Sequence, residues 1–110
     1  MATLRAEFIS VKQSNNELYT GADNVISGRA APSVEPTITG TALTGAGRVT
    51  VPVKCAVRLT AIGGPAYVEW GAPNQDPVAS STNGIRLGAD QAETFLIPNG
   101  YLISAMVAGA

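Results

Sequence analysis

Apolar and polar residues alternate in short runs along most of this chain, and helical spacing of apolar residues is nearly absent. Alternation sends successive side chains to opposite faces, which is the pattern of a β-strand with one buried side. In the clearest run, Val57, Leu59 and Ala61 share a face and the residues between them are polar. The pattern predicts short strands at 3–11, 36–44, 48–62 (one strand or two), 66–70, 85–87, 93–97 and 101–107.

Turn-forming residues separate these runs. The chain has 12 Gly and 7 Pro, and they lie between the apolar stretches. Gly63–Pro65 is predicted to turn the chain, and Pro98–Gly100 to return it from 93–97 into 101–107. Residues 71–83 form a polar loop, and 12–34, the least apolar part, are predicted to form a long surface loop or an extended arm.

This succession of strands and turns predicts an all-β protein, because strands of such length need a second sheet to cover their apolar face. We expect a jelly-roll-like β-sandwich of about eight short antiparallel strands with a long N-terminal loop or arm. An immunoglobulin-like sandwich is disfavoured, since Cys55 and Trp70 are the only residues of their kinds. The chain, 1–110, is interpreted as one domain in which 12–47 is rich in loop or arm.

Composition then removes several classes of function. Only 14% of the residues are charged, against about 25% in a typical domain, and the net charge is −1. This balance argues against a nucleic-acid partner, which needs clustered cations. No apolar stretch reaches the roughly 20 residues of a membrane helix, and the N-terminus does not read as a secretory signal. We therefore expect synthesis in a cytoplasm and no membrane partner.

Candidate chemistry is sparse. The chain has no histidine, so its serines lack the usual general base, and the single cysteine excludes a disulfide within one chain. Among candidates for paired catalytic carboxylates, Glu69 faces away from its neighbour Trp70. Asp76, Asp90 and Glu93 could form an oxygen-ligated calcium site, but we favour the interpretation that they are solvated turn residues. The stretch Gly45-Ala46-Gly47-Arg48 lacks the third glycine of a phosphate-binding loop. We expect no catalytic residue, no cofactor-binding residue, no metal ligand and no enzyme activity.

The aromatic residues suggest one possible ligand platform. Tyr67, Trp70 and Tyr101 are the candidates for stacking on a sugar. Trp70 shares a face with Ala66 and Val68, which favours a place in the core or an interface, so Tyr67 on the other face is the better ligand candidate. Cys55 is interpreted as a small buried apolar residue.

Interaction is the class of function that composition leaves open. A surface poor in Lys, Glu and Asp is typical of surfaces covered by partners. The polar segment 12–47 also suits an arm that becomes ordered on a neighbour, and binding to a repeating lattice lets many weak contacts act together.

The stretch from Cys55 to Val107 resembles a family of small proteins of tailed bacteriophages. The resemblance rests on a strand that ends in an aromatic residue and Gly-Ala, a loop with Asp-Pro, a Phe-x-Ile run, a Gly turn and a last strand. These elements are Val57–Ala61, Ala66–Ala72, Pro77–Ala79, Ile85–Leu87, Glu93–Gly100 and Ile103–Ala105. The loop Gly71–Pro77 is longer here than in the family pattern.

The resemblance implies a structural virion protein with a β-sandwich fold. Its most specific implication is a decoration or cement protein that binds the outer capsid surface, contacts the major capsid protein and itself as a homodimer or homotrimer, and bridges capsomers. The alternatives are a head-fibre, tail or adaptor component, or a carbohydrate-binding sandwich for host attachment in which Tyr67 holds the glycan.

Overall fold

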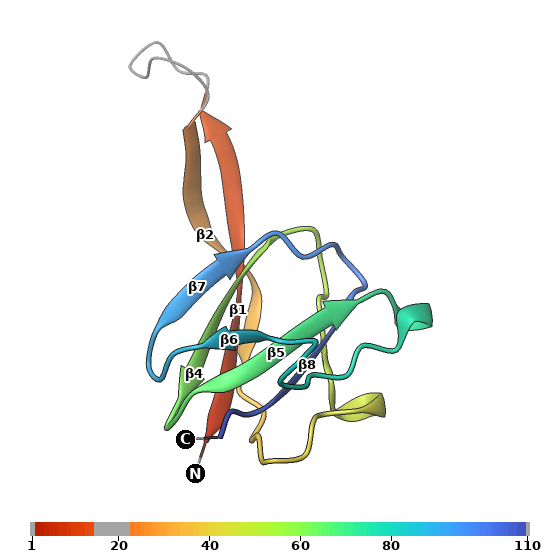
Figure 1. Cartoon of the computed structure of the whole chain (residues 1–110). Coiled ribbons are helices and arrows are strands. Elements are labelled where there is room, and N and C mark those ends of the chain that lie inside the picture. Colours follow the sequence, from red (N-terminus) through yellow and green to blue (C-terminus); the bar gives the residue numbers. More distant parts are fainter. Residues whose placement is uncertain (1, 15–22, 110) are drawn as a thin grey trace.

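The computed structural model describes the backbone of residues 2–14 and 23–109, and the side chains of that part outside 11–27. It contains eight β-strands and, in the described part, no α-helix (Figure 1). Two short 3-10 turns lie at Gly45–Gly47 and Pro73–Gln75. The strands are β1 Thr3–Ser14, β2 Asp23–Val34, β3 Val49–Thr50, β4 Ala56–Ile62, β5 Ala66–Gly71, β6 Ile85–Leu87, β7 Ala92–Phe95 and β8 Leu102–Val107.

The strands form two four-stranded antiparallel sheets, which confirms the predicted β-sandwich. The first sheet has the order β2-β1-β4-β7, and the second has β3-β8-β5-β6. This is the strand order of a jelly roll with one change. In a jelly roll the last strand normally lies between the first and third strands of that fold. Here the equivalent position is the one between β2 and β4, and the N-terminal β1 occupies it. The start of β1 and the end of β8 accordingly lie at the same end of the sandwich (Figure 1).

The core lies between the sheets and is built from the alternating positions of the sequence. Val57, Leu59 and Ala61 of β4 are fully buried, as their shared face predicts. The same alternation holds in β1, β5 and β8, whose inward residues are Leu4, Ala6, Phe8, Ala66, Val68, Ile103 and Ala105. Burial of these apolar side chains is the main favourable term for the fold.

The run 48–62 takes the second of its two predicted forms, and one connection differs from the expectation. The run 48–62 contains two strands, β3 and β4, and these lie in different sheets. The Pro98–Gly100 turn is also a crossing between sheets: β7 pairs with β4 in the first sheet, and β8 pairs with β3 and β5 in the second. The predicted pairing of 93–97 with 101–107 was wrong, because alternation locates strands without saying which strands pair.

The strand predicted at 36–44 is also wrong. This threonine-rich segment forms one isolated bridge, Thr37 with Thr3, and otherwise crosses from one sheet to the other. Ile38 is buried in the core, and its amide donates to the carbonyl of Ala2 in a 3.0 Å hydrogen bond. Farther along, the amide of Leu43 donates to Ala105 of the second sheet. The backbone of this segment hydrogen-bonds to both sheets, so the segment cannot form a strand of either one.

The N-terminal arm is a β-hairpin. β1 and β2 pair from Ala6 with Val34 out to Ser14 with Asp23, and the hairpin projects well beyond the sandwich (Figure 1). The segment predicted at 12–34 as a loop or an arm therefore contains a strand over Asp23–Val34, while residues 15–22 lie outside the described part.

Candidate functional site

The projecting part of the hairpin is the most unusual feature of the molecule. β4 pairs with β1 from Thr3 to Ile9 and no farther. Beyond this point Val11–Ser14 pair with Asp23–Ile26 of β2, and no other strand of the described chain lies beside them. A two-stranded ribbon without a third strand or a covering layer is marginally stable in water. We therefore treat this ribbon, Val11–Ser14 with Asp23–Ile26, as the arm and as the candidate interaction site.

The two strands of the hairpin differ in regularity. Three register shifts interrupt their pairing, and each places an extra residue on β2. The shift beside Ser10 and Val11 adjoins Gly28, whose φ of 132° is open to glycine but rarely to other residues. β1 has no extra residue against either β2 or β4, so the bulges lie on β2 alone.

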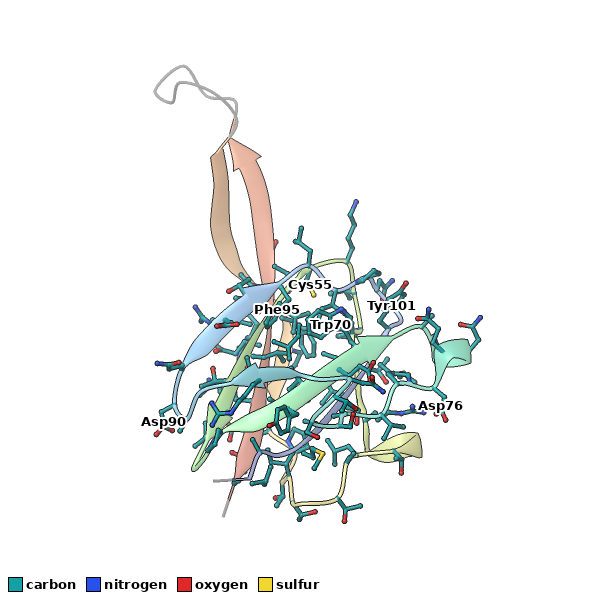
Figure 2. All side chains as sticks on the ribbon, viewed as in Figure 1. Cys55, Trp70, Asp76, Asp90, Phe95 and Tyr101 are labelled. Carbon is teal, nitrogen blue, oxygen red and sulfur yellow. The ribbon has the colours of Figure 1, made fainter. Side chains whose placement is uncertain are left out.

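At the base of the arm the end of the sandwich is partly hollow and apolar. Lys54 and Cys55 line a hollow of about 250 Å³ beside Ser10 and a second one of about 190 Å³ beside Leu96. The side chain of Leu96 is 87% exposed, the most exposed large apolar residue of the described part. Figure 2 places Cys55 at the end of the sandwich from which the arm leaves. Cys55, predicted to be buried, is half-buried there, and desolvation raises the pKa of its thiol.

The outer face of the first sheet carries a ladder of alternating charges. Arg58 donates two hydrogen bonds to Glu7, Nε to Oε1 at 3.1 Å and Nη2 to Oε2 at 3.0 Å. Arg5 lies 3.8 Å from Glu7 and 3.5 Å from Glu35. The hydrogen bonds from Arg58 hold the pKa of the Glu7 carboxyl below its ordinary value. The Glu7 carboxylate is therefore engaged by arginines and is not free to act as a base.

Arg48 has a structural role that the sequence did not reveal. Its side chain is 8% exposed, and Nη1 donates to Asp76 Oδ1 at 2.7 Å and to the carbonyl of Pro77 at 3.0 Å. Nε also donates to the carbonyl of Gly45. The turn Gly45–Gly47, considered above for phosphate, is thus joined by Arg48 to the loop after β5.

Ser104 is a second residue that sequence reasoning missed. It lies on β8 between the buried Ile103 and Ala105, yet its own side chain is also fully buried. Its hydroxyl donates to the carbonyl of Leu43 at 2.7 Å and accepts from the amide of Ala79 at 2.9 Å. Two loops therefore cover the outer face of the second sheet, and Ser104 holds both in place.

The three aromatic candidates do not form a platform. Trp70 and Tyr101 are partly buried and pack against the core, which agrees with the interpretation of Trp70 as a core residue. The Trp70 ring lies 4.8 Å from that of Phe95, centroid to centroid, and joins β5 of one sheet to β7 of the other. Tyr67 lies on the opposite face of β5, paired with Arg86 and Met106. A sugar would find one aromatic ring there.

The acidic candidates are also separated. Asp76 binds Arg48, while Asp90 accepts from the amide of Gly63 at 3.4 Å, and Figure 2 shows the two aspartates on different sides of the molecule. Glu93 is exposed on β7, and Glu69 lies half-buried on β5. In residues 2–14 and 23–109 no three residues of the types His, Cys, Asp and Glu are close enough to hold a metal.

Comparisons with known proteins found no relative of this chain. The chain matches no family model, no curated protein and no solved structure. Among the described residues no helix is long and apolar enough to cross a membrane.

Proposed function

We propose that this protein is a structural virion component that binds the outside of a bacteriophage capsid and cements adjacent capsomers. The observation that carries the proposal is the arm. It extends beyond the sandwich, and its two strands pair with each other and with no other strand of the described chain, so their outer edges are available to a neighbouring molecule. A strand edge of this kind binds through main-chain hydrogen bonds.

The rest of the molecule supports a passive scaffold. Two loops and a cross-sheet aromatic pair fasten the sandwich on which the arm stands. Its charged residues are few, and the ladder on the first sheet is internally neutralised. The resemblance of 55–107 to small phage proteins gives the class of partner, a major capsid protein arranged in a lattice. Many modest contacts repeated over a shell resist rupture together.

Co-sedimentation with heads that lack the protein tests this proposal. We expect the native protein to sediment with heads at a fixed ratio to the major capsid protein. A short-arm variant, in which Asn-Gly replaces residues 12–25 so that Val11 and Ile26 flank a two-residue turn, keeps every strand pair of the sandwich. We expect this variant to stay in the supernatant.

The control is Asn74→Ala, which changes an exposed residue of the Pro73–Gln75 turn. It should bind heads as the native protein does, and thermal unfolding of the short-arm variant checks that its sandwich is intact. Binding to purified tails or to a glycan array in place of heads would overturn the proposal and favour the tail or carbohydrate-binding alternatives. Equal binding of native and short-arm protein to heads would show that the arm does not contribute to capsid binding.

A further inference from the structure

We propose that a hollow at the base of the arm, on the outer face of the first sheet, binds an acidic side chain of a partner protein through the guanidinium groups of Arg29 and Arg58. The hollow has a volume of about 230 Å³ and is lined by Glu7, Phe8, Ile9, Gly28, Arg29 and Arg58. It lies where β1 and β2 leave the sandwich (Figure 1). The inference rests on the proposed function, in which this end of the molecule meets the capsid, and adds the chemistry of that contact.

A β-bulge in β2 brings Arg29 to this face. Phe8 points into the core and pairs with Ala31, so regular pairing would place Ala30 opposite Ile9. The register instead shifts by one residue, and Arg29 pairs with Ile9. Residues that pair across two strands lie on the same face of the sheet, and Ile9 follows the inward Phe8, so Arg29 lies on the outer face. Bulges commonly re-aim a side chain at functional sites, and the side chain re-aimed here is a cation.

Arg29 gives this face an excess of positive charge. Arg5 and Arg58 are engaged by Glu7, and Arg5 also lies beside Glu35. These four charges balance one another. Arg29 is exposed and forms no ion pair with the described part of the chain. A carboxylate that entered the hollow would neutralise the charge that remains.

Small neighbouring residues keep the hollow open above an apolar floor. The Ile9 side chain is 5% exposed and pairs with Ala56 of β4, whose methyl group projects little from the sheet. Gly28 has no side chain, and a Cβ added to it would meet no heavy atom within 4 Å. A guanidinium beside an apolar surface binds a carboxylate more strongly than one in open water, because the local dielectric constant is lower.

The donors that remain suit a single carboxylate. Arg58 uses Nε and Nη2 for Glu7, which leaves Nη1 for a second acceptor, and Arg29 supplies a whole guanidinium. The two oxygens of one carboxylate can therefore accept from both arginines. A phosphate backbone needs clustered cations, whereas this face has one positive charge in excess. An Asp or Glu side chain of the major capsid protein is accordingly the occupant.

Co-sedimentation with heads at a series of protein concentrations measures this contact. Arg29→Glu should weaken binding by about tenfold or more, because two negative charges would then face each other. The control Arg86→Glu makes the same change of charge at an exposed arginine of β6, in the second sheet, and should bind within about twofold of the native protein. Arg29→Gln should weaken binding by a smaller factor, and it replaces the reversal if thermal unfolding shows that Arg29→Glu is misfolded. Native-like binding of the Arg29 variants, or an equal loss in Arg86→Glu, overturns the inference.

A titration of the free protein tests the hollow without any capsid. The probe is a short acetylated peptide of glutamates, and nuclear magnetic resonance follows the Nε–H signals of the arginine side chains. We expect the signals of Arg29 and Arg58 to shift saturably while that of Arg86 does not move. A glutamine peptide of the same length should shift none of them, and inorganic phosphate at equal ionic strength should act more weakly than the glutamate peptide. No saturable shift with the glutamate peptide, or a stronger effect of phosphate, overturns the carboxylate site.

The two experiments separate this inference from the proposed function. Native protein that does not sediment with heads rejects the capsid role, and the titration still decides whether the hollow binds a carboxylate. Native protein and Arg29→Glu that bind heads equally well reject the inference and leave the capsid role standing.

Discussion

At the residue scale, Ser104 and Arg48 hold the loops that cover the sandwich. Each is a polar side chain placed among buried groups, and each hydrogen-bonds to a residue that is distant in the sequence. Ser104 and Leu43 are 61 residues apart, and Arg48 and Asp76 are 28 residues apart. A buried donor or acceptor that loses its partner costs more than the hydrogen bond contributed. Both residues therefore matter for stability although neither touches the arm.

Ser104→Ala should lower the free energy of unfolding by about 1–3 kcal/mol, because it leaves the Ala79 amide and the Leu43 carbonyl without a buried partner. Urea denaturation measures the change. The control Ser81→Ala alters an exposed serine of the same loop and should stay within about 0.5 kcal/mol of the native protein. An effect of Ser104→Ala no larger than that of the control would show that water replaces the hydroxyl without loss.

Glu7 predicts a pH dependence of stability. Its pKa in the folded protein lies below the ordinary glutamate value because Arg58 donates two hydrogen bonds to the carboxylate. This contribution is present above the unfolded pKa of about 4.3 and is lost as the pH falls through the lower folded value. Both side chains are partly exposed, so we expect a loss below about 1 kcal/mol.

Denaturation at a series of pH values from neutral to acidic measures this loss. Glu7→Gln should flatten the acidic part of the profile, and Arg58→Met, which removes the same pair from the other side, should flatten it by a similar amount. Native-like acid sensitivity in both variants would assign the effect to other carboxylates.

At the scale of elements, the contact between Trp70 and Phe95 joins the sheets near their edges. Trp70→Ala should destabilise the protein by about 3 kcal/mol, because it empties space between β5 and β7. Trp70→Phe keeps an aromatic ring at the site and should cost less than half as much. Urea denaturation provides both values, and a cost under about 1 kcal/mol for Trp70→Ala would mean that the ring adds little to the core.

The arm should respond to its surroundings. In dilute protein, where it has no partner, amides at Val11–Ser14 should exchange with solvent faster than those at Leu4–Ile9, which β4 also covers. On heads the arm amides should become protected. Hydrogen exchange followed by mass spectrometry measures both states, and equal protection with and without heads would contradict a role for the arm in binding.

Alternation in the sequence located most of the strands, but it missed β2, predicted a strand at 36–44 that does not form, and did not give the partners. The faces of 57–61, 66–70 and 103–107 could be predicted because each buries one side in a continuous core. β2 could not, since its glycine, proline and polar residues resemble a loop and β1 supplies its pairing. Arg48 and Ser104 were not predictable either, because their partners come from distant loops that only the fold brings near.

At the scale of the whole molecule, the exchange of the last jelly-roll strand for an N-terminal one explains where the arm lies. β1 enters the centre of the first sheet, between β2 and β4, and then continues past the end of β4. The arm is therefore an extension of a central strand, anchored by pairing on both sides at its base. Such an anchor can transmit load from a bound neighbour into the sandwich, as cementing of a shell requires.

Release of DNA from full heads on heating measures cementing most directly. Heads saturated with the native protein should hold their DNA to a higher temperature than heads without it, and heads treated with the short-arm variant should behave like untreated ones. Native protein that binds at full ratio and leaves the release temperature unchanged would contradict the account, because it would decorate the shell without bridging it.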